Sequence, residues 1–361
     1  MSPRKVRISK RQRMAEEWRP LYEVAERVKE LAPWRWMREE SIFGVQDPKT
    51  GEFGYVSVMG MLGEHLSVAV YLGANAIHQF GDLANVADVN DEWEVGSRLM
   101  LIPQMQASFE DQDMVEKEDM NVMRRLKLKY RGRFAYPVFR TIRPGCPLWI
   151  LDKEQIPFLT HVLEQTLDVA SRCKEDMSLL YPDDVDDDEE MYLLRIPTVV
   201  DGEIMWADKI GPVAPFTEEE ITAFLVSSMY EALQNVPRVG NSVEIDLFMV
   251  MTPVMERGDE YPYYPFSLMI VDVDSGMILA QEMLMPLPTL VDMYETVPEE
   301  VARLLLQSNI MPYEIYTQTP EITAVLQPIF NNLDVPVIEV DSLDMVNEAK
   351  AAMFEHLKHG F

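Results

Sequence analysis

Residues 243–280 decide the fold of the C-terminal part of the chain, and they read VEIDLFMVMTPVMERGDEYPYYPFSLMIVDVDSGMILA. The apolar run Val243–Thr252 predicts a central strand. A connection rich in Pro and Tyr follows. Two further apolar runs, Phe266–Asp274 and Met277–Met285, then flank the turn residues Asp274-Ser275-Gly276. We therefore expect a strand followed by a β-hairpin.

Helical and strand patterns alternate after this hairpin. Before the first strand, Thr217 and Glu220 have the spacing of a capping box, which predicts a helix over Glu218–Leu233. The order from Val243 onward is β-β-β-α-β-α-β-α, so residues 212–361 are predicted to form one α/β domain. The later elements are expected as helices over Pro298–Ser308, Pro320–Leu333 and Leu343–Leu357 and as strands over Tyr313–Thr317 and Val335–Val340.

Residues 14–211 show a different pattern. Three β-rich runs, Ile42–Gln46, Phe53–Met59 and Leu66–Tyr71, follow one another without a helix between them, which predicts an antiparallel meander. A strand over Leu99–Ser108 is expected at a sheet edge or with a bulge, because Pro103 interrupts it. This order indicates an α+β domain over residues 14–211, preceded by a basic, disordered arm over residues 1–13.

Two later parts of this domain are also predicted from pattern. Asp152 is expected to cap a long amphipathic helix over Glu154–Cys173. The runs Tyr192–Val200 and Gly202–Ile210 are predicted to be two strands that turn around Asp201-Gly202.

The composition limits the class of protein. The chain has 361 residues, a formal net charge of −29 and two cysteines, which fits two globular domains in a reducing compartment. The acidic balance disfavours general binding to nucleic acid, because phosphates repel an acidic surface. No apolar run is long enough for a membrane span and no secretory signal is visible, so we expect a cytoplasmic protein.

Charge is spread unevenly along the chain. Asp183–Glu190 holds seven acidic residues in eight and is expected to be a solvated loop. A basic cluster, the candidate surface for phosphate groups, consists of Arg124, Arg125, Lys127, Lys129, Arg131 and Arg133.

The order of elements after Val243 resembles the ribonuclease H-like fold of ribonuclease H and retroviral-type integrases. Val243–Asp246 is similar to the first strand of the integrase version, whose aspartate binds metal. Val271–Ile278 looks like its second hairpin, and Pro312–Thr317 looks like its fourth strand. This resemblance implies a metal site that contains Asp246.

The sequence departs from that family at the end of the fourth strand. The family has a second metal-binding aspartate there, and this chain has Gln318. Two-metal chemistry needs clustered carboxylates, and a neutral glutamine is a weaker ligand. We therefore predict a degenerate domain without a bound cofactor. The acids that could still hold Mg²⁺ or Mn²⁺ are Asp246, Asp272, Asp274 and Glu348.

The chain as a whole also resembles a bacterial two-domain family of unknown function. Ser41–Gly73, the segment IPQMQASFED and the segment PFSLMIVDVDSGMIL suggest this likeness. It supports the domain layout and implies no mechanism.

Two further groups of residues are candidates for function. Glu64 and His65 precede a strand, where the pair could do acid–base chemistry, although no metal-binding spacing accompanies them. Tyr261, Tyr263 and Tyr264 lie in a rigid Pro/Tyr segment that looks exposed and could contact a protein partner. The alternative is that this segment covers an edge or an end of the sheet.

Three classes of function remain open at this point. The first is a non-catalytic binding or scaffold protein that contacts a protein partner. The second is a metal-dependent nuclease or phosphoryl-transfer enzyme that uses Asp246 with Asp272, Asp274 or Glu348, with the basic cluster guiding phosphates. The third is a small-molecule enzyme built around Glu64 and His65.

Overall fold

The structure is a computed structural model of the 361-residue chain, and it divides into two compact units. It describes residues 14–86, 92–181, 191–218, 220–238, 241–256 and 261–359. The predicted basic arm and the acidic segment Asp183–Glu190 lie outside these described residues. The first unit holds residues up to Arg143 together with Leu148–Thr217, and the second holds Pro144–Pro147 and Glu218 onward.

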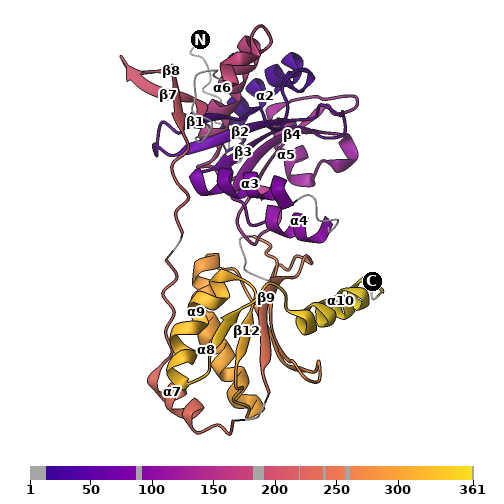
Figure 1. Ribbon diagram of the computed structural model, residues 1–361. Helices are drawn as coiled ribbons and strands as arrows, with labels where there is room; N and C mark the ends of the chain where they lie inside the picture. Colours follow the sequence, from indigo (N-terminus) through magenta and orange to yellow (C-terminus); the bar gives the residue numbers. More distant parts are fainter. Residues whose placement is uncertain are drawn as a thin grey trace, which may run out of the picture. The chain divides into compact units, whose positions relative to one another are not determined.

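The first unit is built on an eight-stranded mixed sheet (Figure 1). Its strand order is β6-β5-β4-β3-β2-β1-β7-β8, and its pairs are antiparallel except β1 with β7, which is parallel. The strands are β1 (Phe43–Gln46), β2 (Phe53–Met59), β3 (Leu66–Leu72), β4 (Gln104–Glu110), β5 (Tyr136–Ile142), β6 (Trp149–Ile150), β7 (Met191–Val200) and β8 (Glu203–Pro212).

Helices cover both faces of this sheet. α2 and α6 pack together against one face, where Tyr22 of α2 and Leu163 of α6 share a buried core with Phe139 of β5. α3 and α4 lie on the other face, where Tyr71 stacks on Phe80. The helices are α2 (Arg19–Leu31), α3 (Ala74–Val86), α4 (Glu92–Leu99), α5 (Lys117–Leu126) and α6 (Ile156–Cys173), with short 3-10 helices η1 (Pro33–Arg35), η2 (Gln112–Met114) and η3 (Met177–Leu180).

The predicted meander β1-β2-β3 is confirmed, and so is the β7–β8 hairpin. Two expectations in this unit are wrong. β4 is an interior strand between β3 and β5, because it begins at Gln104, after the proline that was expected to interrupt it. Asp152 does not cap α6: Gln155 is the N-cap residue, and Asp152 instead pairs with Arg143.

The second unit is built on a five-stranded mixed sheet with the order β11-β10-β9-β12-β13. β9, β10 and β11 are antiparallel, whereas β12 runs parallel to β9 and β13 runs parallel to β12. β9 is central, as its apolar run predicts. The strands are β9 (Val243–Met249), β10 (Phe266–Asp272), β11 (Ile278–Leu284), β12 (Ile315–Thr317) and β13 (Val337–Glu339).

The helices of this unit also divide between the two sheet faces (Figure 1). α8 and α9 pack together on one face, and α10 covers the face that carries Met269 and Val271. These elements are α7 (Ser227–Gln234), α8 (Leu290–Ser308), α9 (Pro320–Phe330), η4 (Asn331–Leu333) and α10 (Asp344–His359). No helix among the described residues is long and apolar enough to cross a bilayer.

The capping box predicted at Thr217 and Glu220 is wrong. The chain from Glu218 to Val226 has no helix among its described residues, and α7 begins at Ser227. Asn75 explains the difference, because it holds the backbone N–H and C=O of Thr217 in two hydrogen bonds of 2.9 and 2.7 Å. Thr217 is therefore anchored to the first unit and not at the start of a helix.

Candidate functional site

Asp246 lies near the middle of the central strand β9 and faces α10. The residue is 4% exposed, and the ammonium of Lys350 on α10 donates a hydrogen bond to its carboxylate. The Lys350 Nζ also lies 4.7 Å from the centre of the Phe248 ring, so the cation is held by a carboxylate and an aromatic face. The residue that the resemblance implies as a metal ligand therefore carries an internal counter-ion.

Glu244 supports α10 from the same face of β9. It is 7% exposed, and its Oε2 accepts a hydrogen bond of 2.8 Å from the backbone N–H of Val346 in the first turn of α10. A carboxylate at a helix N-terminus satisfies an otherwise unpaired N–H group and interacts favourably with the helix dipole. This contact fixes where the helix begins on the sheet, and Lys350 follows one turn later.

Asp272 lies at the end of β10, where hydrogen-bond donors surround its carboxylate. Its carboxylate accepts hydrogen bonds from the hydroxyl of Ser275 (2.6 Å), the backbone N–H of Ser275 (2.8 Å) and the side-chain amide of Asn241 (2.6 Å). These donors, the Ser275 hydroxyl first, hold the pKa of Asp272 below its usual range. Asp272 thus closes the tight turn between β10 and β11.

The register of the sheet separates Asp246 from Asp272. Asp246 is paired with Met269, whereas Asp272 is paired with Val243. Cross-strand partners share a face and successive residues alternate, so the two carboxylates lie on opposite faces of the sheet. They are also three positions apart along β9, roughly 10 Å at about 3.3 Å per residue. A single metal pair cannot be shared between them.

The remaining two acids do not join Asp246 either. Asp274 is exposed beyond the end of the strand. Glu348 is exposed on α10 and precedes Lys350 by two positions, and residues two apart on a helix point in different directions. No group of three His, Cys, Asp or Glu side chains suited to a metal ion occurs within the described ranges.

Gln318, which stands where the resembled family has its second aspartate, has a local role. Its side-chain amide is exposed and donates a hydrogen bond of 3.0 Å to the backbone C=O of Asp341. The contact ties the end of β12 to the loop that leads into α10.

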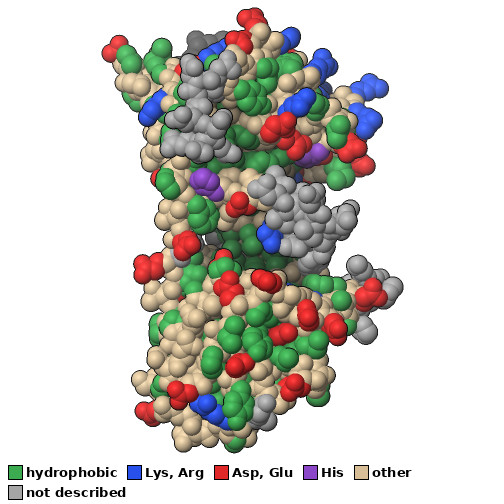
Figure 2. All heavy atoms as spheres, in the orientation of Figure 1, with side chains coloured by type: hydrophobic (Ala, Val, Ile, Leu, Met, Phe, Trp, Pro, Cys, Tyr) green, Lys and Arg blue, Asp and Glu red, His purple; other side chains and the backbone are tan. Residues whose placement is uncertain are grey.

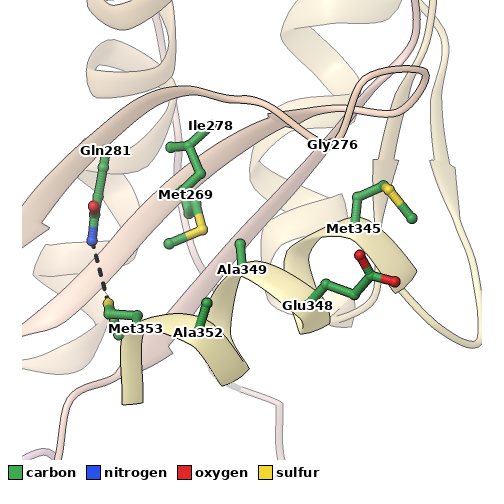
Figure 3. Close-up of a pocket in the computed structure, with 9 residues that line it drawn as sticks. All are labelled: Met269, Gly276, Ile278, Gln281, Met345, Glu348, Ala349, Ala352 and Met353. Atoms are coloured by element: carbon green, nitrogen blue, oxygen red, sulfur yellow. Dashed lines mark hydrogen bonds between the residues drawn. The ribbon is translucent and has the colours of Figure 1, made fainter. Parts of the chain in front are cut away.

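An open groove lies between the β10–β11 hairpin and α10 (Figure 3). Its volume is about 480 Å³, and Met269, which is fully buried, lies at its base. Gln281 crosses the groove to contact the sulfur of Met353 at 3.7 Å. Figure 3 shows Glu348 at the Gly276 end, beside Met345. Methionine side chains and one carboxylate therefore lie together along the groove.

Lys350 was missed by the sequence reasoning. A lone lysine on an otherwise apolar helix face, opposite a strand with two buried acids, is the signal that could have identified it. The signal is weak, because tertiary packing decides which residues of α10 face which residues of β9.

The exposure of the aromatic segment differs from the prediction. Tyr263 is 4% exposed and Tyr264 is 9% exposed, while Tyr261 is half-buried. The backbone N–H of Tyr264 donates to the C=O of Gly145, and Tyr263 forms a bridge with Val254. The expectation of an exposed segment is wrong for Tyr263 and Tyr264, and their burial agrees with the alternative that the segment covers an edge or an end of the sheet.

The candidates in the first unit lie at the surface. Glu64 and His65 are exposed in the loop before β3. The six residues of the basic cluster, at the C-terminal end of α5 and in the loop after it, are also exposed. Arg133 approaches Asp111 at 3.8 Å, and Arg124 contacts Asn121 at 3.0 Å. Their role in phosphate binding stays a prediction.

Comparison with known proteins finds two family models that match separate parts of the chain, and both describe domains of unknown function. No curated protein and no solved structure matches this chain. Residues 18–195 match the family model described as a domain of unknown function (DUF7309), and residues 229–354 match a second, described as a domain of unknown function (DUF6930).

Proposed function

We propose that this protein is a non-catalytic binding protein whose second unit is a degenerate member of the ribonuclease H-like fold. The element order β-β-β-α-β-α-β-α supports the fold, together with a central first strand and a last helix that covers the face carrying Asp246. The hairpin strands lie on one side of β9 and the parallel strands on the other.

The ion pair between Lys350 and Asp246 carries this proposal. A divalent cation needs several oxygen ligands and open coordination positions. Here the ammonium group pairs with the Asp246 carboxylate, and its positive charge would repel an approaching cation. A lysine ammonium in place of a metal ion is the arrangement expected in a domain that keeps the fold and has lost metal-dependent catalysis.

The partner that fits this unit is a protein segment that is both apolar and basic. Residues 218–361 contain 24 Asp and Glu against five Lys and Arg, so this part of the chain carries a net negative charge that attracts cations. Figure 2 shows acidic side chains spread over the visible face of this unit. The groove beside α10 offers methionine side chains, which adapt to varied apolar partners, with Glu348 beside them.

Calorimetric titration with Mn²⁺ tests the loss of the metal site. We expect no stoichiometric binding to the wild-type chain and none to Asp246→Asn. Lys350→Met removes the internal cation, so it tests whether Lys350 keeps a metal ion away from Asp246. Stoichiometric Mn²⁺ binding to the wild type that disappears in Asp246→Asn would overturn the proposal, and nuclease assays would then follow.

Selection from a displayed library of random peptides tests the groove. We expect enriched sequences to combine apolar residues with Lys or Arg, and their binding to weaken at least tenfold in Ala352→Arg, which places a bulky cation in the groove. Ala351→Arg is the matched control, because Ala351 is exposed on the same helix but does not line the groove. Equal loss in both variants, or no enrichment, would remove the groove from the proposal.

A further inference from the structure

The strand β8 forms one edge of the eight-stranded sheet in the first unit. β1 pairs with β7 at Leu193–Arg195, and β7 then continues to Val200 with β8 as its neighbour. Figure 1 shows this β7–β8 hairpin extending past β1. A two-stranded ribbon is marginally stable by itself, so an additional strand along its edge would stabilise it.

The turn of this hairpin determines which backbone groups face outward. Asp201 and Gly202 both have positive φ, 53° and 85°, and form a two-residue loop between the paired residues Val200 and Glu203. In such a hairpin the two residues that flank the loop hydrogen-bond to each other, and the pattern alternates from there. The outward N–H and C=O groups are therefore those of Ile204, Trp206, Asp208 and Ile210. No other described residue pairs with these backbone groups.

Apolar side chains are exposed along the same hairpin. Val199 is 69% exposed, Val200 50% and Met205 56%. An unpaired edge with exposed apolar side chains is a site where another strand can add. The charged residues of β8 then decide which strand fits.

Three residues of β8 are charged: Glu203, Asp208 and Lys209. In an antiparallel pair of two β8 strands centred on Trp206, Glu203 of each copy lies directly opposite Lys209 of the other. This register also brings outward residues opposite outward residues, with Ile204 facing Asp208. A register with Asp208 opposite Lys209 would place outward backbone groups of one strand opposite inward groups of the other. A register centred on Asp208 would place the two Asp208 carboxylates directly opposite each other.

We propose that β8 is a self-complementary edge at which two copies of this chain pair antiparallel about Trp206, joining their sheets. The proposal is independent of the proposed function, because it concerns the other unit and needs no ligand. Trp206 is half-buried against His161 of α6, with ring centres 5.9 Å apart, so it is held in place before pairing.

Analytical ultracentrifugation of the full chain and its charge variants tests this pairing. We expect a concentration-dependent dimer for the wild type. Glu203→Lys and Lys209→Glu should each weaken the dimer at least tenfold, because each puts like charges opposite one another twice per dimer. An equimolar mixture of the two variants should dimerise again, since Lys then faces Glu at both positions. Lys49→Glu, an exposed charge reversal outside β8, is the matched control.

Three results would overturn the proposal. The first is a wild-type chain that stays monomeric at every concentration, which would mean that Lys209 acts only to protect the edge. The second is a dimer that tolerates both reversals. The third is a mixture of the two variants that does not regain association while circular dichroism shows both to be folded.

Discussion

At the scale of single residues, Lys350 changes what Asp246 can do. A carboxylate in the interior is costly to ionise unless a cation or several hydrogen bonds compensate it. Lys350 supplies that compensation while keeping its side chain about 20% exposed. The pair can thus form inside the unit without a metal ion.

We expect Lys350→Met to lower the free energy of unfolding by about 2–4 kcal/mol, because it leaves the Asp246 carboxylate without its partner. Asp246→Asn together with Lys350→Met should return stability to within about 1 kcal/mol of the wild type, since no buried charge remains. Urea denaturation of the four proteins of this double-mutant cycle measures both effects. Additive single effects would show that the two side chains do not interact.

Asp272 predicts a pH dependence of stability. Its folded pKa is lowered, so its contribution is present above the unfolded value of about 3.9 and is lost as the pH falls through the folded pKa. We expect Asp272→Asn to lower the free energy of unfolding at pH 7 by about 1–3 kcal/mol. The difference from the wild type should shrink below about pH 4. Urea denaturation across this range checks it, with the exposed neighbour Asp274→Asn as control. A difference in the free energy of unfolding between the wild type and Asp272→Asn that does not change with pH would contradict the role of Asp272.

At the scale of elements, helix α5 ends in a backbone conformation that glycine would adopt more easily than the residue found there. α5 ends at Leu126, and Lys127 caps it with a φ of 62°. A non-glycine residue in this left-handed region is strained, and glycine is the usual residue there.

We expect Lys127→Gly to raise the free energy of unfolding by about 0.5–1 kcal/mol, because relief of this strain exceeds the added entropy of the unfolded chain. Lys129→Gly in the following loop is the control and should be neutral or destabilising. Thermal unfolding in parallel compares the two. An equal change in both would mean that loss of positive charge, and not the backbone conformation, is responsible.

At the scale of the whole molecule, a short segment of the first half of the chain belongs to the second unit. Pro144–Pro147 packs there, with Cys146 3% exposed and the C=O of Gly145 bound to Tyr264. Gly145 has a φ of 78°, and a Cβ added to it would lie 2.8 Å from the Cβ of Pro286. The second unit therefore depends on residues that precede it by more than seventy positions.

We expect Gly145→Ala to destabilise the second unit by about 1–3 kcal/mol, through backbone strain and contact with Pro286. Gly132→Ala is the matched control, because its φ is also positive, 109°, but nothing lies within 4 Å of the added Cβ. Hydrogen exchange of the β9 and β10 amides reports on the second unit directly. Exchange that is unchanged in Gly145→Ala would contradict this dependence.

The sequence by itself determined the elements that rest on local pattern. β2 has the predicted bounds, and the hairpin at Asp201-Gly202 forms as expected. Alternation, helical periodicity and turn chemistry act over a few residues, so a single chain displays them. The order of elements after Val243 followed from the same signals.

Tertiary structure alone decided which of these elements meet. The parallel pairing of β1 with β7, the inclusion of Pro144–Pro147 in the second unit and the burial of Tyr263 all depend on contacts between distant residues. The same holds for the candidate site: Asp246 was visible in the sequence, but its partner Lys350 lies 104 positions away. Such pairs are set by sheet register and helix packing, for which local sequence carries only a weak signal.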